Sequence, residues 1–106
     1  MFARLLEMTV KPEKKSEFLD KVREEITPIL SQYRGFISIF QLEVEADSTK
    51  MYAITFWNEK QDAEKYEKEN FAKVAAIYEP LLAKPALVRR CKVSETIYKK
   101  NVTLAA

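Results

Sequence analysis

Apolar residues recur along the chain with two different periods. In some stretches apolar and polar positions alternate, which is the period of a β-strand. In others an apolar residue returns every three or four positions, which is the period of an α-helix. The alternating stretches predict strands over residues 2–10, 36–45, 51–57 and 87–98, with one helix between the first two strands and another between the last two.

The first predicted helix opens at KPEK (11–14) and carries an apolar stripe over residues 18–33. Pro28 falls inside this stripe. Because proline lacks an N–H and crowds the preceding turn, we expect a kink near residues 24–25 rather than an end. Gly35 follows the last apolar position and is predicted to cap the C-terminus of the helix.

The second predicted helix follows the third strand. Asn58 is expected to cap its N-terminus, with Gln61 three residues later in a capping-box arrangement. The apolar stripe of this helix runs over residues 63–81, and Pro80 is predicted to kink or end it.

The resulting order, β-α-β-β-α-β, is that of the ferredoxin-like class of α+β folds. The short ADST connection (46–49) makes the second and third strands an antiparallel hairpin. Right-handed crossovers then place both helices on one face of a four-stranded antiparallel sheet. We expect a single domain over residues 1–99, followed by a C-terminal tail over 100–106.

The predicted sheet is apolar on both faces, whereas a sheet with helices on one side normally has a polar outer face. In the third strand, Tyr52, Ile54 and Phe56 alternate with the apolar residues Met51, Ala53 and Trp57. An exposed patch of this kind predicts a homodimer formed through the sheet. Scattered surface hydrophobic residues are the alternative. A slip of one residue in the hairpin register would move Trp57 from one face to the other.

Composition narrows the function without deciding it. The 18 basic and 16 acidic residues give a net charge of +2 and are finely interspersed, which argues against nucleic acid or an anionic membrane as a partner. We also expect no membrane span and no signal peptide, because apolar runs are short. The lone Cys91 cannot form an internal disulfide, so a cytoplasmic setting and a buried, inert thiol are expected.

Two residue types are nearly or wholly absent. The chain has no histidine and a single glycine. Histidine-based catalytic triads, the usual zinc sites and glycine-rich phosphate loops are therefore excluded. No metal or cofactor is predicted.

One ordered set of segments resembles the antibiotic biosynthesis monooxygenase (ABM) superfamily. The set consists of YRGFISIFQLE (33–43), MYAITFW (51–57) and NEKQDAEKYEKENF (58–71), and the similarity extends over residues 1–99. The resemblance implies a dimeric α+β barrel. It also implies a cofactor-independent monooxygenase acting on phenol or quinol substrates, or an enzyme that degrades heme.

The heme-degrading branch of that superfamily uses a strand-end tryptophan, a helical histidine and an asparagine on the first strand. Only Trp57 matches here. The histidine slot falls near Ala75, and the first strand offers Leu5 and Leu6 instead of an asparagine. Heme degradation is therefore disfavoured.

A cofactor-independent oxygenase needs an apolar pocket and a group that stabilises a phenolate anion. The catalytic candidates are Trp57, Tyr66 and Asn58. The substrate-binding candidates are Trp57, Phe40, Tyr52, Tyr66, Asn70 and Arg34, and Arg4 is a second cation that could stabilise the anion.

Each candidate also has a purely structural interpretation: a packed aromatic for Trp57 and Tyr66, a helix cap for Asn58, a solvated or paired charge for the arginines. The alternative functions are a non-catalytic barrel that binds a small hydrophobic ligand and a structural or regulatory dimer.

Overall fold

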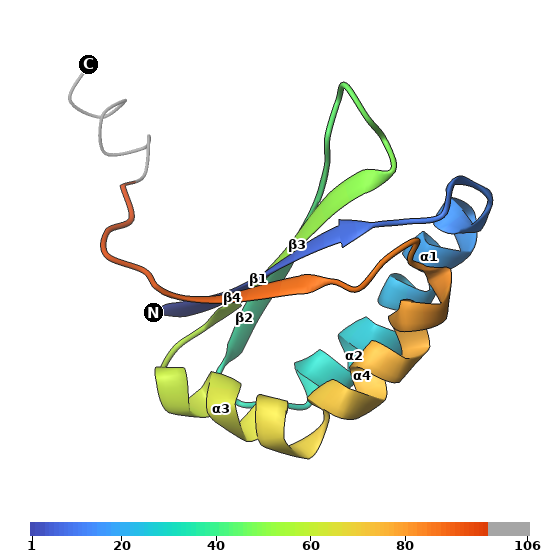
Figure 1. The fold of residues 1–106 in the computed structure, drawn as a ribbon. Helices are drawn as coiled ribbons and strands as arrows, with labels where there is room; N and C mark the ends of the chain where they lie inside the picture. The colour runs from blue at the N-terminus through green and yellow to red at the C-terminus, as the bar shows by residue number, and fades with distance from the viewer. Residues whose placement is uncertain (98–106) are drawn as a thin grey trace.

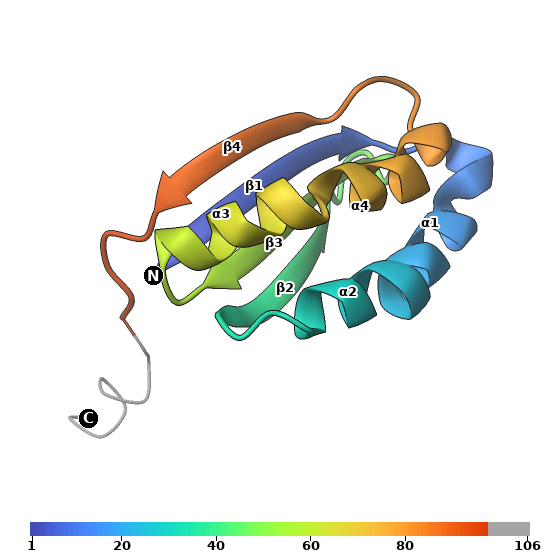
Figure 2. The same cartoon turned by 90° about the horizontal axis from the view of Figure 1, so that it is seen from below.

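The computed structural model describes residues 1–97 and confirms the ferredoxin-like α+β fold. A four-stranded antiparallel sheet (Figure 1) has the order β2-β3-β1-β4, as Figure 2 shows. Its strands are β1 (Phe2–Thr9), β2 (Phe36–Glu43), β3 (Lys50–Trp57) and β4 (Leu87–Lys92). The predicted fourth strand was too long, since β4 ends at Lys92; Tyr98 and the tail lie outside the described residues.

Two helical arms cover the same face of the sheet (Figure 2). The first arm contains α1 (Lys15–Lys21), a π-helical segment (Val22–Ile26) and α2 (Thr27–Ser31). The second arm contains α3 (Lys60–Glu69) and α4 (Phe71–Tyr78). The first arm lies on the β2 side and contacts β2, whereas the second contacts β1 and β3 (Figure 2). The space between the two arms and the sheet holds the core.

Pro28 distorts the first arm without ending it, as the sequence predicted. Proline 28 cannot donate a backbone hydrogen bond, and the turn before it widens into the π segment. The backbone N–H of Thr27 reaches back five residues to the carbonyl of Val22, which also accepts a hydrogen bond from the Thr27 hydroxyl at 2.8 Å. The wider turn keeps Val22 and Ile26 buried against the sheet.

The predicted cap of the second arm was wrong by one residue. The cap is Glu59, whose side chain forms a reciprocal capping box with Asp62. Asn58 lies just beyond β3, and its N–H donates to the carbonyl of Gly35 at 2.8 Å. β3 ends at Trp57, as the sequence pattern predicted, and the helix begins one residue later than expected.

Gly35 serves a different purpose from the predicted helix cap. The first arm ends at Ser31 with Gln32 as its C-cap, and Gly35 does not have the positive φ typical of a glycine cap. Instead, a Cβ at Gly35 would overlap the side chain of Asp62. The glycine is needed because the chain that enters β2 meets the first turn of α3 at this point.

A β-bulge at the start of β2 decides which side chains face the helices. Phe36 pairs with Trp57, but Ser38 pairs with Phe56, so Ile37 is an extra residue. The bulge places Phe36, Ile39 and Gln41 on the helix side, a set that simple alternation cannot produce.

The register of β3 places Trp57 on the helix-facing side, where it is fully buried. The opposite face, called here the outer sheet face, carries Ala3, Leu5, Phe40, Leu42, Tyr52, Ile54, Phe56, Leu87 and Cys91. Phe40 is 54% exposed. The prediction that Cys91 is buried was wrong, because its thiol is exposed. The apolar outer face predicted from the sequence is thus present.

Candidate functional site

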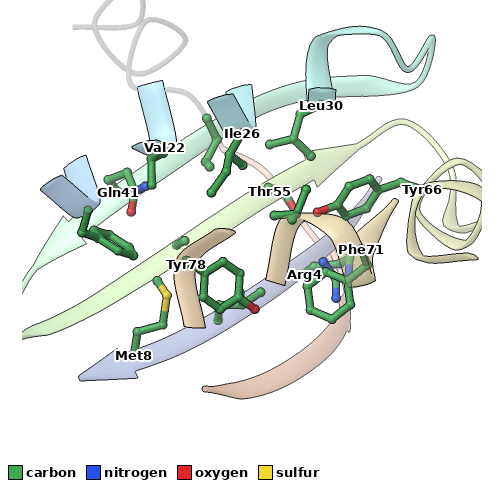
Figure 3. A pocket seen from close by; sticks show the side chains of 15 residues that line it. Arg4, Met8, Val22, Ile26, Leu30, Gln41, Thr55, Tyr66, Phe71 and Tyr78 are labelled. Carbon is green, nitrogen blue, oxygen red and sulfur yellow. The ribbon is translucent and has the colours of Figure 1, made fainter. Parts of the chain in front are cut away.

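A cavity of about 40 Å³ lies between the sheet and the two helical arms (Figure 3). At roughly 10–15 Å³ for each water molecule, it has room for about three. Its wall is mostly aliphatic and aromatic carbon. The polar side chains that line it are Arg4, Gln41, Thr55, Tyr66 and Tyr78.

Among residues 1–97, Arg4 is the only charged residue on the cavity wall, and it is 2% exposed. Its Nε donates to Oε2 of Glu67 at 2.7 Å, and the same oxygen accepts a hydrogen bond from Nε of Arg90 at 2.9 Å. The Arg4 guanidinium also lies 4.2 Å from the ring centre of Phe71. A buried cation needs such partners, and here one carboxylate shared by two arginines supplies them.

The charges of this cluster balance, since Arg4 and Arg90 lie beside Glu67 and Glu64, but of these four residues Arg4 alone borders the cavity. Two guanidinium groups share one carboxylate, and Arg90 is also near Glu64, at 3.6 Å. Only one of the five N–H donors of Arg4 is directed to Glu67. The site can therefore stabilise an anion in an apolar environment, where an electrostatic interaction is stronger than in water.

Two tyrosine hydroxyls border the same cavity. Burial raises the pKa of Tyr78 to about 12, and burial likewise raises the pKa of Tyr66, although the nearby Arg4 opposes both increases. Both hydroxyls are therefore protonated near neutral pH. They can donate hydrogen bonds to an oxygen in the cavity, but they cannot serve as bases there.

Trp57 lies behind the cavity wall rather than on it. Its indole is stacked on Tyr66, and its Nε1 donates to Oγ1 of Thr55 at 3.0 Å. Tyr33 and Phe36 approach it edge-on, with ring centres 6.1 and 5.5 Å away. Tyr66 and Thr55 both line the cavity, so Trp57 fixes two of its wall residues.

The other sequence-predicted candidates are distributed over three places. Asn70 and the exposed Arg34 border an open surface cleft of about 370 Å³, where Asn70 Nδ2 donates to the Tyr33 hydroxyl at 2.7 Å. Asn58 is exposed beside a second cleft. Phe40 and Tyr52 lie on the outer sheet face, away from the cavity. Of the predicted residues, Trp57, Tyr66 and Arg4 come together in the core.

Several residues of the site were not identified from the sequence. Tyr78 lies on the predicted stripe of the second helix but was interpreted only as packing. Gln41 was missed because the bulge at Ile37 reverses the expected alternation of β2. The sequence did offer one indication of Glu67. It follows the inward-facing Tyr66 and lies one helical turn before the arm breaks at Asn70.

A sequence profile described as Antibiotic biosynthesis monooxygenase (ABM) matches residues 1–76, most of the chain. The chain belongs to the ABM family. No curated protein shows significant sequence similarity to it. The match covers β1 through most of α4 and so includes Arg4, Gln41, Thr55 and Tyr66 of the cavity wall.

Solved structures share the ABM fold with low sequence identity. SnoaB, a cofactor-independent oxygenase from Streptomyces nogalater, superimposes with a TM-score of 0.77 at 15% identity, covering 91% of this chain and 95% of SnoaB. A Nitrosomonas europaea protein named for the same family gives a TM-score of 0.75 at 14% identity, with 90% and 100% coverage. A conserved protein from Methanosarcina mazei Go1 gives 0.74 at 17% identity, with 87% and 92% coverage.

At these identities the likeness shows the fold alone, so the chemistry of this ABM domain rests on its own residues. Within residues 1–97, no three His, Cys, Asp or Glu side chains are grouped so as to hold a metal ion. Over the same range, no helix has the length and apolar character needed to cross a membrane.

Proposed function

We propose that this ABM protein is a cofactor-independent monooxygenase that acts on a small aromatic substrate of the phenol or quinol type. The observation that carries the proposal is the buried Arg4 guanidinium on the wall of an otherwise apolar cavity. A phenolate is the form of such a substrate that gives an electron to dioxygen, and Arg4 favours that anionic form.

The overall reaction balances without an external reductant. The phenolate transfers one electron to dioxygen, and the resulting substrate radical and superoxide combine to form a carbon–oxygen bond. Cleavage of the O–O bond with release of water then gives a quinone, so that one phenol and one dioxygen yield one quinone and one water. Arg4 stabilises the anion, and Tyr66 and Tyr78 donate hydrogen bonds to a substrate oxygen.

The substrate must widen the cavity. Benzene fills an engineered protein cavity of roughly 150 Å³, which exceeds the 40 Å³ found here. Widening is easiest where the helical arms are already irregular: at the π segment and at Asn70, where the second arm breaks. Val22, Ile26 and Phe71 border the cavity beside these irregular points.

The proposal includes a homodimer formed through the outer sheet face. Phe40 and Phe56 pack edge-on there, with 5.5 Å between ring centres, and Leu42 and Leu87 are 45% and 56% exposed. A contiguous apolar surface of this kind favours burial against a second copy. Such a dimer would leave the cavity, on the other side of the sheet, within each protomer.

One observation favours the alternative, a non-catalytic barrel that binds a small hydrophobic ligand. None of the five polar side chains on the cavity wall is a base near neutral pH, because the two tyrosines have raised pKa values and the others are an arginine, an amide and a threonine. A phenol would have to lose its proton to water before it reacted.

Oxygen uptake distinguishes the two functions. With hydroquinone or 1,4-naphthohydroquinone and a metal chelator, the wild-type protein should consume oxygen faster than the spontaneous oxidation of the quinol. Arg4→Gln should abolish most of this increase, and circular dichroism should show that it still folds, since Arg90 continues to pair with Glu67. Binding of the quinols without any acceleration would establish the ligand-binding alternative.

A further inference from the structure

Gln41 is half-buried, and its amide group is enclosed without a partner among residues 1–97. Both atoms of its amide group, Oε1 and Nε2, are inaccessible, and among residues 1–97 neither has a hydrogen-bond partner. An unpaired buried amide destabilises the folded state, whereas a leucine of similar size would fill the same space without this disadvantage. The amide is therefore available to a molecule that occupies the cavity.

The position of Gln41 links the interior to the surface. It lines the cavity and also a surface groove of about 280 Å³ between the first arm and β2. Val22 and Ile39 likewise line both spaces. Within residues 1–97, β2 lies at one edge of the sheet, next to the π segment (Figure 2). These three residues therefore separate the cavity from the outside.

Gln41 and Arg4 lie at opposite ends of the cavity (Figure 3). Gln41 is on β2 and Arg4 is on β1, with β3 between them. Gln41 is level with Leu6, two residues along β1 from Arg4. At about 4.8 Å between neighbouring strands and about 3.4 Å per residue, the two positions are roughly 12 Å apart. The wall between them is mostly apolar, with Ile26 and Leu30 contributed by the first arm and Thr55 by β3.

We propose that Gln41 is a specificity-determining residue that hydrogen-bonds the end of the substrate farthest from Arg4. This inference rests on the proposed function and narrows its substrate class. The substrate is an aromatic ring that carries oxygen at both ends, one held by Arg4 as the anion and the other by Gln41. It enters between the π segment and β2.

The amide can bind both the substrate and the product of the proposed reaction. Its N–H groups donate to a carbonyl oxygen, and its Oε1 accepts from a hydroxyl. Gln41 can therefore bind the far-end hydroxyl of a quinol and, once another ring carbon has been oxygenated with release of one water, the far-end carbonyl of the resulting hydroxyquinone. A monophenol with a methyl group in that place would leave the amide unpaired, and buried polar groups discriminate strongly against such analogues.

Two probes of nearly equal shape test this inference. Hydroquinone and 4-methylphenol differ by one hydroxyl in place of one methyl group at the far end of the ring. Binding is measured by calorimetry without oxygen, which prevents turnover and oxidation of the quinol. The wild-type protein should bind hydroquinone roughly tenfold more tightly than 4-methylphenol. Gln41→Leu should remove or reverse that preference.

Gln61→Leu is the matched control, because Gln61 is exposed on α3 and borders no part of the cavity. It should leave the tenfold preference unchanged. Urea unfolding provides the readout that separates recognition from structure. Gln41→Leu should leave the free energy of unfolding unchanged or raise it, whereas a residue with only a structural role would lower it.

Two outcomes overturn the inference and leave the proposed function intact: equal binding of both probes by the wild type together with oxygenase activity, or a preference for hydroquinone that Gln41→Leu retains. A clear loss of stability in Gln41→Leu with an unchanged preference leads to the same conclusion. Failure of both probes to bind at millimolar concentration overturns the inference and the proposed function together.

Discussion

The indole of Trp57 is stacked on the ring of Tyr66, with 5.3 Å between ring centres and 25° between planes. Trp57 ends β3, and Tyr66 lies two turns into the helix that follows, so this pair joins the sheet to the second arm. Tyr66 lines the cavity and Trp57 does not. The tryptophan is a positioning residue for the wall rather than a part of the wall.

Trp57→Phe should lower stability by about 1–3 kcal/mol, because the smaller ring leaves a void and the hydrogen bond to Thr55 is lost. Urea unfolding followed by circular dichroism measures the change. Phe56→Leu, on the outer sheet face, is the control for a change in aromatic content at the neighbouring position. An equally small effect of both substitutions would show that the stack contributes little.

Arg4→Gln should move the pH profile of oxygen uptake. The phenolate is the reactive form, so the rate rises with pH until the bound substrate is ionised. A nearby cation lowers the pKa of the bound phenol, and its removal should place the midpoint about one pH unit higher or more. Arg89→Gln is the control, since Arg89 is exposed on the outer face. An unchanged midpoint would contradict the assigned role of Arg4.

Alkaline pH should destabilise the protein through Tyr78. Its pKa rises from an ordinary 10.0 to about 12 on folding because of burial. A folded-state pKa above the unfolded value means that this stability is fully present below pH 10 and is lost as pH rises toward 12. Tyr78→Phe should flatten the fall in unfolding free energy in this window, as measured by urea titrations at several pH values.

Tyr66→Phe should also reduce the decrease in unfolding free energy at alkaline pH, since burial raises the pKa of Tyr66 as well. Tyr52→Phe is the control, because Tyr52 lies on the other face of the sheet. If all three variants lose stability in parallel with the wild type, burial of the tyrosines is not the cause.

Phe40→Lys should weaken the proposed dimer by tenfold or more, since it places a charge within an apolar interface. Sedimentation at low micromolar concentration should report a dimer for the wild type and a monomer for the variant. Val88→Lys is the control, because Val88 is 41% exposed but lies on the helix-facing side of β4. A wild-type monomer would overturn the proposed interface.

Glu59→Ala should destabilise the protein by about 0.5–2 kcal/mol through loss of the capping box with Asp62. Asn58→Ala is the matched control. Its side chain is exposed and does not cap the helix, while its backbone hydrogen bond to Gly35 is retained. If both variants lowered the melting temperature equally, Asn58 would contribute to the cap as much as Glu59 does.

The sequence alone determined the order of elements, the fold class and the apolar character of both sheet faces. These properties follow from local periodicity: the strands alternate, the helices carry stripes, and Pro28 falls where a helix can bend but continue. Trp57 and Tyr66 were both recognised because each belongs to a clear apolar pattern.

Only the tertiary structure decided which residues meet. The bulge at Ile37 adds one residue to β2 and so moves Gln41 to the helix-facing side, an event that no local period indicates. The hairpin register places Trp57 inward and leaves Phe40 outward. Arg4 becomes a buried cation because Glu67 and Arg90, distant in sequence, converge on it across β1, α3 and β4. Long-range pairing fixes these positions, and the chemistry of the cavity depends on them.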